Sequence, residues 1–509
     1  MIYDLLIIGA GPAGLAAANT ATSLGAAVLV ADENMRPGGQ LIKQTHKFFG
    51  SKEHSAGERG FKIGEKLLEE AMKSGCTVSL NTRVYNLLKE AGFFTAVCIS
   101  NGKEIFHKAR AVVLATGASE NSLPFEGWTL PGVITAGAAQ TMVNINKVLP
   151  GKKMLMIGSG NVGLIVAYQM LQAGMEIAAV LEAAQKVGGY EVHAAKLRRA
   201  KVPVLTGCTI LRANGRADVE SATICDVDDN FQPLPSTERD IAVDTICIAV
   251  GLSPLYQLAR LAGAQLGYNA GKGGFVPFCY ENLSTTVEGL YVAGDITAIE
   301  EASIAIEEGK LAALSACVGL GLTEEKAVLE ARTRYNANLS AIRMESMPAA
   351  AGISKTEAKC LQPHEKSGIQ VVTECVQNIP CNPCESACPT GALKVGRPIS
   401  NMPEFQKQLC IGCLKCVEVC PGLAVFVINY DFSCTEATVA FAYEYMPLPG
   451  KGDEVAAVDR DGKALCTSRV VDVKKAGDKT NTLKIAVPKD IAAIVRGIEF
   501  YTGGGGVNG

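Results

Sequence analysis

The sequence predicts an α/β chain of two nucleotide-binding folds, followed by a cysteine-rich metal-binding segment and a small β-module. Two glycine-rich turns predict the first part, because each turn follows an apolar strand and opens a helix. Eight of the 18 cysteines lie between Cys375 and Cys420, and this clustering predicts the metal-binding segment. Alternating apolar and polar residues after Pro447 predict the β-module.

The composition limits the partners and the compartment that we expect. A chain of 509 residues has room for about three or four domains. Its net charge of −3 favours neither nucleic acid nor acidic lipid as a partner. The N-terminal residues lack the basic region and cleavage site of a secretory signal. Clustered cysteines in a large chain of this kind indicate a reducing compartment, so we expect the protein in the cytoplasm.

Two long uncharged stretches match membrane spans in length but not in pattern. Both Leu5–Ala31 and Met154–Met175 are interrupted by spaced glycines and by polar residues such as Asn19 and Asn161. This pattern is typical of a buried strand, turn and helix. We therefore expect no membrane span.

The order of apolar runs, turns and linkers divides the chain into five segments. A linker rich in alanine and proline, residues 347–352, separates the nucleotide-binding part from the rest. The predicted segments are 1–122 and 256–335 as two parts of one nucleotide-binding domain, 123–255 as a second one, 353–432 as the cysteine-rich domain and 440–500 as the β-module.

The first glycine turn predicts a site for a dinucleotide. Gly9 permits a tight turn, Gly11 lets the backbone approach a pyrophosphate, and Gly14 lets the helix pack on the strand. The N-terminus of that helix faces the negative charge of the phosphates. A glycine-rich turn in an unrelated α/β protein is the alternative. The residues assigned to this turn are Gly9, Gly11, Pro12, Ala13 and Gly14.

An acid at the end of the next strand supports this assignment. Asp32 follows the apolar run and stands 23 residues after Gly9, where a carboxylate can accept hydrogen bonds from ribose hydroxyls. Glu33 is a neighbouring candidate for the same role. We prefer Asp32 because it directly follows the strand.

Three later pieces favour FAD over NAD at this site. They are a Pro-Gly-Gly-Gln loop, an apolar strand that ends in small residues, and a second strand that ends in an acid. Their order resembles the glutathione and thioredoxin reductase type of flavoprotein, which has two dinucleotide-binding domains, over about residues 1–335. The resemblance implies that Gly294 and Asp295 hold the ribityl–pyrophosphate region of FAD. The other residues assigned to FAD are Gly39, Gln40, Ala115, Thr116 and Gly117.

The second glycine turn predicts a nicotinamide nucleotide site. Glu182 ends the strand after this turn, where a carboxylate suits a free 2′-hydroxyl and repels a 2′-phosphate, so we favour NAD(H). An empty site, or one that holds another adenine nucleotide, is the alternative. The residues assigned to NAD are Gly158, Gly160, Asn161, Val162, Gly163, Glu182 and Gly251.

Disulfide chemistry is not expected, although the resemblance includes disulfide reductases. Such enzymes carry a pair of closely spaced cysteines beside the flavin, and residues 1–335 contain no such pair. The cysteines there are isolated and mostly lie in apolar runs, which is typical of buried structural residues.

The cysteine spacing predicts two [4Fe–4S] clusters, and at least one. The run C-x2-C-x2-C-x3-C-P at residues 410–421 resembles that of a bacterial ferredoxin, in which the fourth cysteine serves the other cluster. A shorter run at residues 381–389 has Asn378 where the first cysteine would stand, and Cys375 is the expected substitute, with Cys360 less favoured. Zinc fits the spacing poorly. One cluster is assigned Cys388, Cys410, Cys413 and Cys416, and the other Cys375, Cys381, Cys384 and Cys420.

A closer resemblance is carried by residues 115–120, 123–133 and 135–140, together with Asp32-Glu33 and the Pro-Gly-Gly-Gln loop. These pieces look like the flavoprotein α subunits of heteromeric amine dehydrogenases, among them dye-linked L-proline dehydrogenase, octopine and nopaline oxidases, hydrogen cyanide synthase and the sarcosine oxidase α chain. In that group a separate, glycine-oxidase-like FAD subunit oxidises the amino or imino acid.

The closer resemblance implies that this chain moves electrons between FAD, NAD(H) and the clusters in a hetero-oligomer. It leaves open FMN or ATP at a subunit interface or in the second nucleotide site. Several relatives end in a [2Fe–2S]-type segment, and this difference puts the electron acceptor in doubt. The alternatives are an NADH:ferredoxin-type or glutamate-synthase-like electron donor, and a non-catalytic relay with a structural nucleotide. No general base can be identified, because the five histidines lie outside the motifs.

Overall fold

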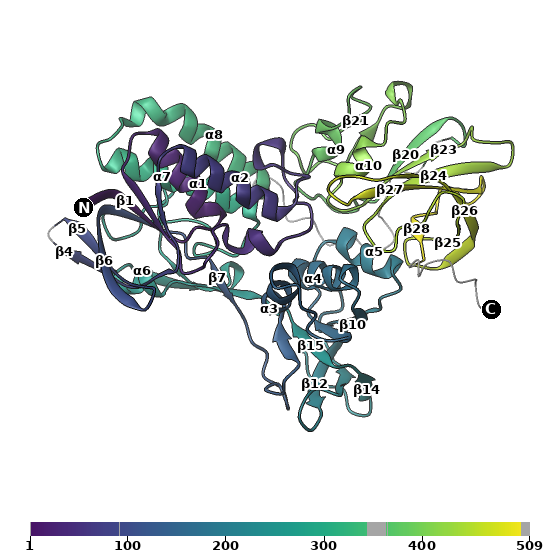
Figure 1. Ribbon diagram of the computed structural model, residues 1–509, viewed down its shortest axis with the longest axis horizontal. Coiled ribbons are helices and arrows are strands. Elements are labelled where there is room, and N and C mark those ends of the chain that lie inside the picture. The colour runs from purple at the N-terminus through teal and green to yellow at the C-terminus, as the bar shows by residue number, and fades with distance from the viewer. Residues whose placement is uncertain (1, 91, 344–362, 364, 500–509) are drawn as a thin grey trace. The chain divides into compact units, whose positions relative to one another are not determined.

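The computed structural model describes residues 2–90, 92–343, 363 and 365–499, which form two compact units (Figure 1). Each unit combines segments that lie far apart in the sequence. The first unit consists of Met1–Thr45, Glu58–Asn121 and Gly251–Pro348, and the second of His46–Gly57, Ser122–Val250 and Ala349–Gly509.

The first unit is built on a seven-stranded sheet in the order β3-β2-β1-β6-β5-β4, with β19 beside β6. β1 pairs in parallel with β2 and β6, and its residues Leu5, Leu6 and Ile7 are fully buried, as expected for a strand covered on both faces. The strands are β1 (Ile2–Ile8), β2 (Val28–Ala31), β3 (Thr77–Ser79), β4 (Thr82–Glu90), β5 (Phe93–Ser100), β6 (Lys103–Leu114) and β19 (Leu290–Val292).

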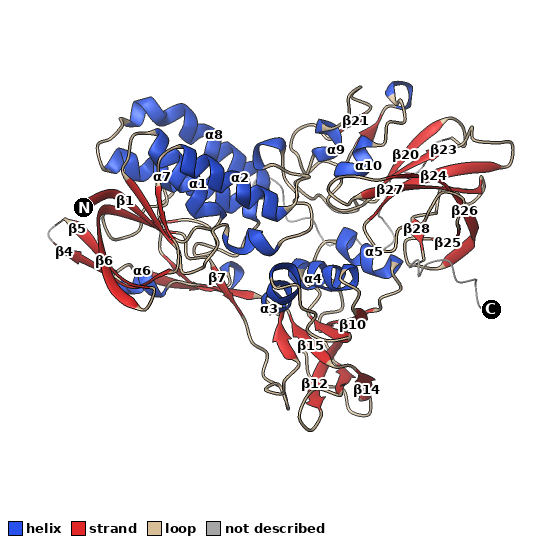
Figure 2. Cartoon of the chain, in the orientation of Figure 1, coloured by secondary structure: helices blue, strands red, loops and turns tan. Residues whose placement is uncertain are grey.

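Four long helices accompany this sheet, and Figure 2 shows them gathered beside it. Pro12 begins α1, where its missing N–H costs no helical hydrogen bond. α1 packs so closely on α7 that a Cβ added at Gly309 would lie 2.1 Å from the Ala13 carbonyl oxygen. The helices are α1 (Pro12–Ser23), α2 (Gly60–Lys73), α7 (Ala302–Gly319) and α8 (Glu325–Arg343).

Smaller elements complete the first unit. β7 pairs antiparallel with β16, and β17 pairs antiparallel with β18. These elements are η1 (Gly39–Lys43), β7 (Ala118–Glu120), β16 (Leu252–Pro254), α6 (Gln257–Leu261), β17 (Leu266–Asn269), η4 (Ala270–Lys272) and β18 (Gly274–Pro277).

The second unit contains the other nucleotide-binding fold, a parallel sheet in the order β11-β10-β9-β15-β8. A three-stranded antiparallel sheet, β12-β13-β14, accompanies it. The elements are η2 (Lys52–His54), β8 (Val133–Thr135), α3 (Ala136–Gln140), the π-helical η3 (Thr141–Ile145), β9 (Lys153–Ile157), α4 (Asn161–Gln172), β10 (Glu176–Glu182), α5 (Glu191–Arg199), β11 (Val204–Thr206), β12 (Cys208–Asn214), β13 (Ser221–Asp226), β14 (Arg239–Ala242) and β15 (Thr245–Ile248).

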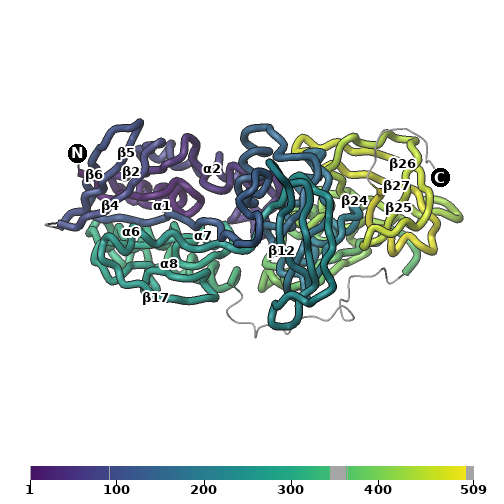
Figure 3. Tube along the Cα trace, turned by 90° about the horizontal axis from the view of Figure 1, so that it is seen from below, coloured from purple at the N-terminus to yellow at the C-terminus, as the bar shows by residue number. Residues whose placement is uncertain are grey.

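One antiparallel sheet runs through the rest of the second unit, in the order β20-β23-β24-β27-β26-β25-β28. Figure 3 shows four of its strands, β24 to β27, at the same end of the chain. The elements are β20 (Ile369–Thr373), α9 (Pro383–Ser386), β21 (Leu393–Lys394), β22 (Glu404–Phe405), η5 (Lys407–Leu409), α10 (Lys415–Val419), β23 (Val425–Asn429), β24 (Glu436–Tyr443), β25 (Glu454–Val458), β26 (Ala464–Lys474), β27 (Asn481–Pro488) and β28 (Gly497–Ile498).

The division of the chain differs from the predicted segments in two respects. The cysteine-rich segment and the β-module share one sheet, because β23 pairs with β24 and both contribute buried residues, such as Phe426 and Phe441, to one core. The second nucleotide fold also belongs to the same unit as the cysteine-rich segment. None of the helices in the described part of the chain is both long and apolar enough to cross a membrane.

Candidate functional site

The first glycine turn has no room for side chains at two of its three glycines. Gly9 has a φ of +106°, and a Cβ there would lie 2.2 Å from the Ala115 carbonyl oxygen. A Cβ at Gly14 would lie 1.8 Å from the Gly9 carbonyl oxygen, whereas one at Gly11 would meet only Gly39 Cα at 3.9 Å. The turn is therefore closed toward the protein and open at Gly11, as a pyrophosphate cradle requires.

Asp32 lies at this turn, and its neighbour Glu33 does not. The buried carboxylate of Asp32 accepts hydrogen bonds from the Ala10 N–H at 2.6 Å and from the Asn34 N–H at 2.7 Å. Glu33 is exposed and forms an ion pair with Arg83 at 2.8 Å. Of the two candidate acids, only Asp32 is held beside the turn.

The Pro-Gly-Gly-Gln loop closes over the same turn. The Gly38 N–H donates to the Ala10 carbonyl oxygen at 2.7 Å, and a Cβ at Gly39 would lie 2.8 Å from Gly11 Cα. Gln40 follows as an exposed residue. The end of β6 adjoins this turn as well, because the Ala115 N–H donates to the Ile8 carbonyl oxygen at 2.8 Å. The predicted FAD residues Pro12 and Ala13 lie in the first turn of α1, and Thr116 and Gly117 directly follow Ala115.

Asp295 follows β19 in a strongly acidic environment. Burial raises the pKa of its carboxyl group to about 7, against a hydrogen bond from the Glu300 N–H, and the nearby charge of Glu308 raises it further. Glu308 accepts a hydrogen bond from the Gly294 N–H at 2.8 Å, and the Arg343 guanidinium pairs with Glu308 at 2.5 Å. The sequence analysis missed Glu308 and Arg343, since neither belongs to a motif and only the packing of α7 and α8 brings them here.

The second glycine turn repeats the geometry of the first. A Cβ at Gly158 would lie 2.3 Å from the Ala249 carbonyl oxygen, and one at Gly163 would lie 2.1 Å from the Gly158 carbonyl oxygen. Gly160 again faces open space, and Asn161 and Val162 begin α4. Gly251, predicted for the same site, belongs to the first unit, where its carbonyl oxygen accepts a hydrogen bond from the Asn121 N–H at 3.0 Å.

Glu182 is held at the second turn as Asp32 is at the first. Its carboxylate accepts hydrogen bonds from the Ser159 hydroxyl at 2.6 Å, the Ser159 N–H at 3.1 Å and the Ala184 N–H at 3.0 Å. The side chain thus ends beside the turn that would carry the phosphates.

A second Gly-Gly pair, which the sequence analysis missed, covers this turn. The Gly189 N–H donates to the Ser159 carbonyl oxygen at 2.8 Å, and a Cβ at Gly189 would lie 2.7 Å from the Asn161 nitrogen. A signal was present in the sequence, because Gly188 stands six residues after Glu182 just as Gly38 stands six residues after Asp32. Both nucleotide folds therefore have the same covered turn.

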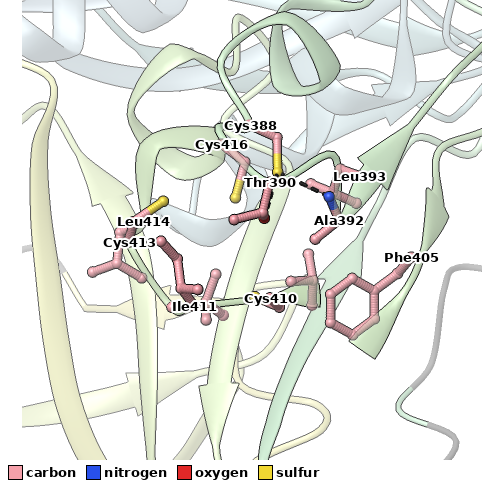
Figure 4. A pocket seen from close by; sticks show the side chains of 13 residues that line it. Cys388, Thr390, Ala392, Leu393, Phe405, Cys410, Ile411, Cys413, Leu414 and Cys416 are labelled. Carbon is pink, nitrogen blue, oxygen red and sulfur yellow. Dashed lines mark hydrogen bonds between the residues drawn. The ribbon is translucent and has the colours of Figure 1, made fainter. Parts of the chain in front are cut away.

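The clustered cysteines surround two separate cavities, and Figure 4 shows the first of them. Each cavity is lined by four of the eight thiols, in the same two sets that the sequence predicts. The first, of about 350 Å³, is lined by Cys388, Cys410, Cys413 and Cys416, and the second, of about 480 Å³, by Cys375, Cys381, Cys384 and Cys420. Four thiols around an open space suit a cluster with one thiolate at each iron.

Backbone amides point at one sulfur of each set. The Ala392 N–H donates to Cys388 Sγ at 3.2 Å, and the Ala424 N–H donates to Cys420 Sγ at 3.4 Å. Such hydrogen bonds stabilise a thiolate ligand. In the part of the chain that is described, no three His, Cys, Asp or Glu side chains are grouped to hold a single metal ion.

Two expectations about the fourth ligand have different outcomes. Asn378, which replaces a cysteine in the shorter run, donates from Nδ2 to the Ser400 carbonyl oxygen at 3.0 Å and does not line the cavity, whereas Cys375 does. Cys360 lies outside the described residues.

A loop of the N-terminal half lines the second cavity. Phe49 is among its lining residues, and Gly50 forms a β-bridge with Cys381. The Gly50 carbonyl oxygen accepts a hydrogen bond from the Asn382 N–H at 3.1 Å, and Lys47 donates to the Glu418 carbonyl oxygen. No local signal identified this loop, because its contacts join residues more than 300 positions apart.

Comparisons with known proteins agree with this geometry. Residues 3–309 match the family described as pyridine nucleotide-disulphide oxidoreductase, and residues 402–426 match a 4Fe-4S binding domain.

Curated relatives belong to three oxidising enzymes of several polypeptides. In Agrobacterium tumefaciens, one polypeptide of opine oxidase is 32% identical over 343 residues, which are 63% of this chain and 66% of that protein. The HcnB subunit of hydrogen cyanide synthase from Pseudomonas aeruginosa is 26% identical over 80% of this chain and 90% of that protein. The alpha subunit of sarcosine oxidase from Rhizobium meliloti is 28% identical over 64% of this chain and 30% of that protein. These relatives confirm the closer resemblance inferred from the sequence.

Solved structures confirm the fold class. The L-proline dehydrogenase of P. horikoshii aligns with a TM-score of 0.52 and 22% identity, over 66% of this chain and 59% of that one. The thioredoxin reductase of T. acidophilum aligns with a TM-score of 0.52 and 21% identity, over 62% of this chain and 97% of that one.

Proposed function

The chain belongs to the pyridine nucleotide-disulphide oxidoreductase family, and we propose that it is the electron-transferring flavin and iron–sulfur subunit of an amino- or imino-acid dehydrogenase. One observation carries the proposal. Two cavities, each lined by four cysteines, lie on the same chain as two covered glycine turns with an acid at each.

The residues at the first turn fit FAD. The open face at Gly11 leaves room for a pyrophosphate, and Asp32 presents a buried carboxylate for the ribose hydroxyls. When bound, FAD can take up two electrons together and release them singly, which joins two-electron chemistry to one-electron carriers. The protein's part is to bind the dinucleotide and to surround Asp295 with the acids that keep its carboxyl group protonated near neutral pH.

The second turn supports NAD(H). Glu182 is the residue that would accept hydrogen bonds from a ribose and exclude a 2′-phosphate. FMN or ATP remains the alternative for this turn or for a subunit interface.

The two sets of cysteines support two [4Fe–4S] clusters. The chain supplies the thiols, the amides that point at Cys388 and Cys420, and the surrounding apolar side chains. Tight spacing of oxidisable thiols in such sites suits a reducing compartment, so we propose the cytoplasm.

The relatives support the substrate class and the partner. Their printed names are subunits of opine oxidase, hydrogen cyanide synthase and sarcosine oxidase. We propose that the partner is a glycine-oxidase-like FAD subunit, which oxidises a proline-, hydroxyproline-, sarcosine- or opine-like substrate. NAD(H) or a ferredoxin-type protein is the proposed partner for the electrons.

Anaerobic purification with co-expressed neighbouring subunits tests the proposal. The expected result is FAD, about eight irons and eight acid-labile sulfides per chain, and bleaching of the flavin spectrum when one amine of this class is added. Bleaching by NADH and by no amine would favour the NADH:ferredoxin-type alternative. Zinc in place of iron, or a first nucleotide site without flavin, would contradict the proposal.

A further inference from the structure

The helix α5 of the second nucleotide fold lies directly against the second cysteine cavity. Its residue Val192 lines the cavity, and a Cβ added at Gly422 would lie 3.2 Å from Val192 Cβ. At its N-terminus, the Glu191 N–H donates to Gln377 Oε1 at 2.8 Å. Gln377 lies between Cys375 and Cys381, so the helix contacts the ligand loops on two sides.

Lys196 brings a positive charge from α5 to this cavity. Its Nζ donates to the carbonyl oxygen of Pro421 at 2.7 Å, and Pro421 directly follows Cys420. The side chain is buried, with 4% of the residue exposed, and its Nζ also lies 5.3 Å from the centroid of the Tyr168 ring. A buried ammonium interacts with a nearby charge far more strongly than an exposed one does.

Further cations surround the carboxylate next to Cys375. The buried Glu374 lies 2.7 Å from Arg496, 3.7 Å from Arg199 and 3.8 Å from Arg460. Three guanidinium groups thus face one carboxylate, and Arg199 also donates to the Leu423 carbonyl oxygen at 3.3 Å. The local charge at this end of the cavity is therefore positive.

The first cavity has no comparable buried cation among the described residues. Lys415 and Lys394, which lie beside its ligands, are exposed. Lys407 forms an ion pair with Glu365 at 2.7 Å at the surface. Solvent and salt screen such charges.

We propose that Lys196 is a positioning residue that raises the reduction potential of the cluster held by Cys375, Cys381, Cys384 and Cys420 above that of the other cluster. The inference rests on the proposed function, which supplies the clusters. A cluster bound by four thiolates gains one negative charge when it takes up one electron, and a nearby buried cation stabilises that charge. The first electron to reach the pair therefore resides beside α5.

An anaerobic potentiometric titration of the full chain, followed by electron paramagnetic resonance, tests this inference. Wild-type protein should show two one-electron steps, and Cys413→Ser identifies the step of the first cavity. In Lys196→Met the reduced-to-oxidised ratio of the second cluster at a fixed potential should fall about tenfold, a shift of about 59 mV. Lys196→Arg should keep the wild-type value.

Lys201→Met is the matched control, since Lys201 follows the same helix but is exposed and pairs with Glu499 at 2.6 Å. It should move neither step. If Lys196→Met does not retain its clusters, Arg460→Gln decides, and it should lower the same step. Equal shifts of both steps, or no shift in Lys196→Met or in Arg460→Gln, would overturn the inference. Wild-type protein without two clusters would instead contradict the proposed function.

Discussion

Gly11 and Gly14 lie three residues apart in one turn, but a side chain would meet different surroundings at each. Space at Gly11 is open except for Gly39 Cα at 3.9 Å, and its φ of −77° suits alanine. At Gly14 a Cβ would collide with the Gly9 carbonyl oxygen at 1.8 Å. The two glycines therefore serve different purposes, one for a ligand and one for packing.

This difference predicts opposite outcomes for two substitutions. Gly11→Ala should change the free energy of unfolding of the apoprotein by less than about 0.5 kcal/mol and lower FAD affinity at least about tenfold. Gly14→Ala should destabilise the apoprotein by more than about 2 kcal/mol, because backbone must move. Thermal unfolding and bound-flavin content measure both effects. A Gly11→Ala protein that retains FAD normally would argue against a phosphate at this turn.

Asp295 predicts a pH dependence of stability. Burial raises the pKa of its carboxyl group from 3.8 to about 7, so the folded state holds a proton that the unfolded state releases. This contribution to stability is present below pH 4 and is lost as the pH rises toward 7, by at most about 1.4 kcal/mol per pH unit.

Asp295→Asn should remove that contribution. The variant apoprotein should gain stability over wild type as the pH rises from 4 to 7 and show no further relative gain above pH 8. Urea unfolding at several pH values measures the difference. A constant difference between the two proteins across this range would show that Asp295 does not titrate there.

At the scale of elements, the pairing of β23 with β24 joins two segments that the sequence analysis separates. Val427 pairs with Ala440 in the ladder, and Phe426 and Phe441 share one core. The separation was reasonable from the sequence, because a cysteine-rich run and an alternating apolar pattern differ in composition. Composition does not specify which strands pair, however, and β23 without β24 would present an unpaired edge.

We therefore predict that residues 365–432 do not fold alone. A fragment 365–499 should take up iron and sulfide and show a cooperative unfolding transition, whereas 365–432 should do neither. Anaerobic reconstitution, followed by circular dichroism and iron analysis, tests this. Stable clusters in the shorter fragment would show that the sheet is dispensable for the ligand loops.

At the scale of the whole molecule, the second nucleotide fold and both cysteine cavities belong to one unit, while the first nucleotide fold forms the other. A ligand that binds only the folded state stabilises the unit that holds it. Cluster binding and FAD binding should therefore stabilise different parts of the chain.

Calorimetry of the holoprotein and of two depleted forms checks this expectation. Removal of iron by a chelator should lower the transition of the second unit by several degrees and leave the first in place, and removal of FAD should do the reverse. Limited proteolysis during heating assigns each transition to its unit. A single transition that responds equally to both treatments would mean that the units unfold together.

The sequence by itself determined the two glycine turns, their acids, and the division of the eight thiols into two sets. It could do so because a tight turn, a phosphate cradle and a cubane each impose requirements within a few residues, and glycine and cysteine spacings record them. The tertiary structure alone decided that Lys196 lies beside Pro421 and that Glu308 and Arg343 surround Asp295. Lys196 and Pro421 are 225 positions apart, and contacts at such separations depend on how whole elements pack, which no local pattern specifies.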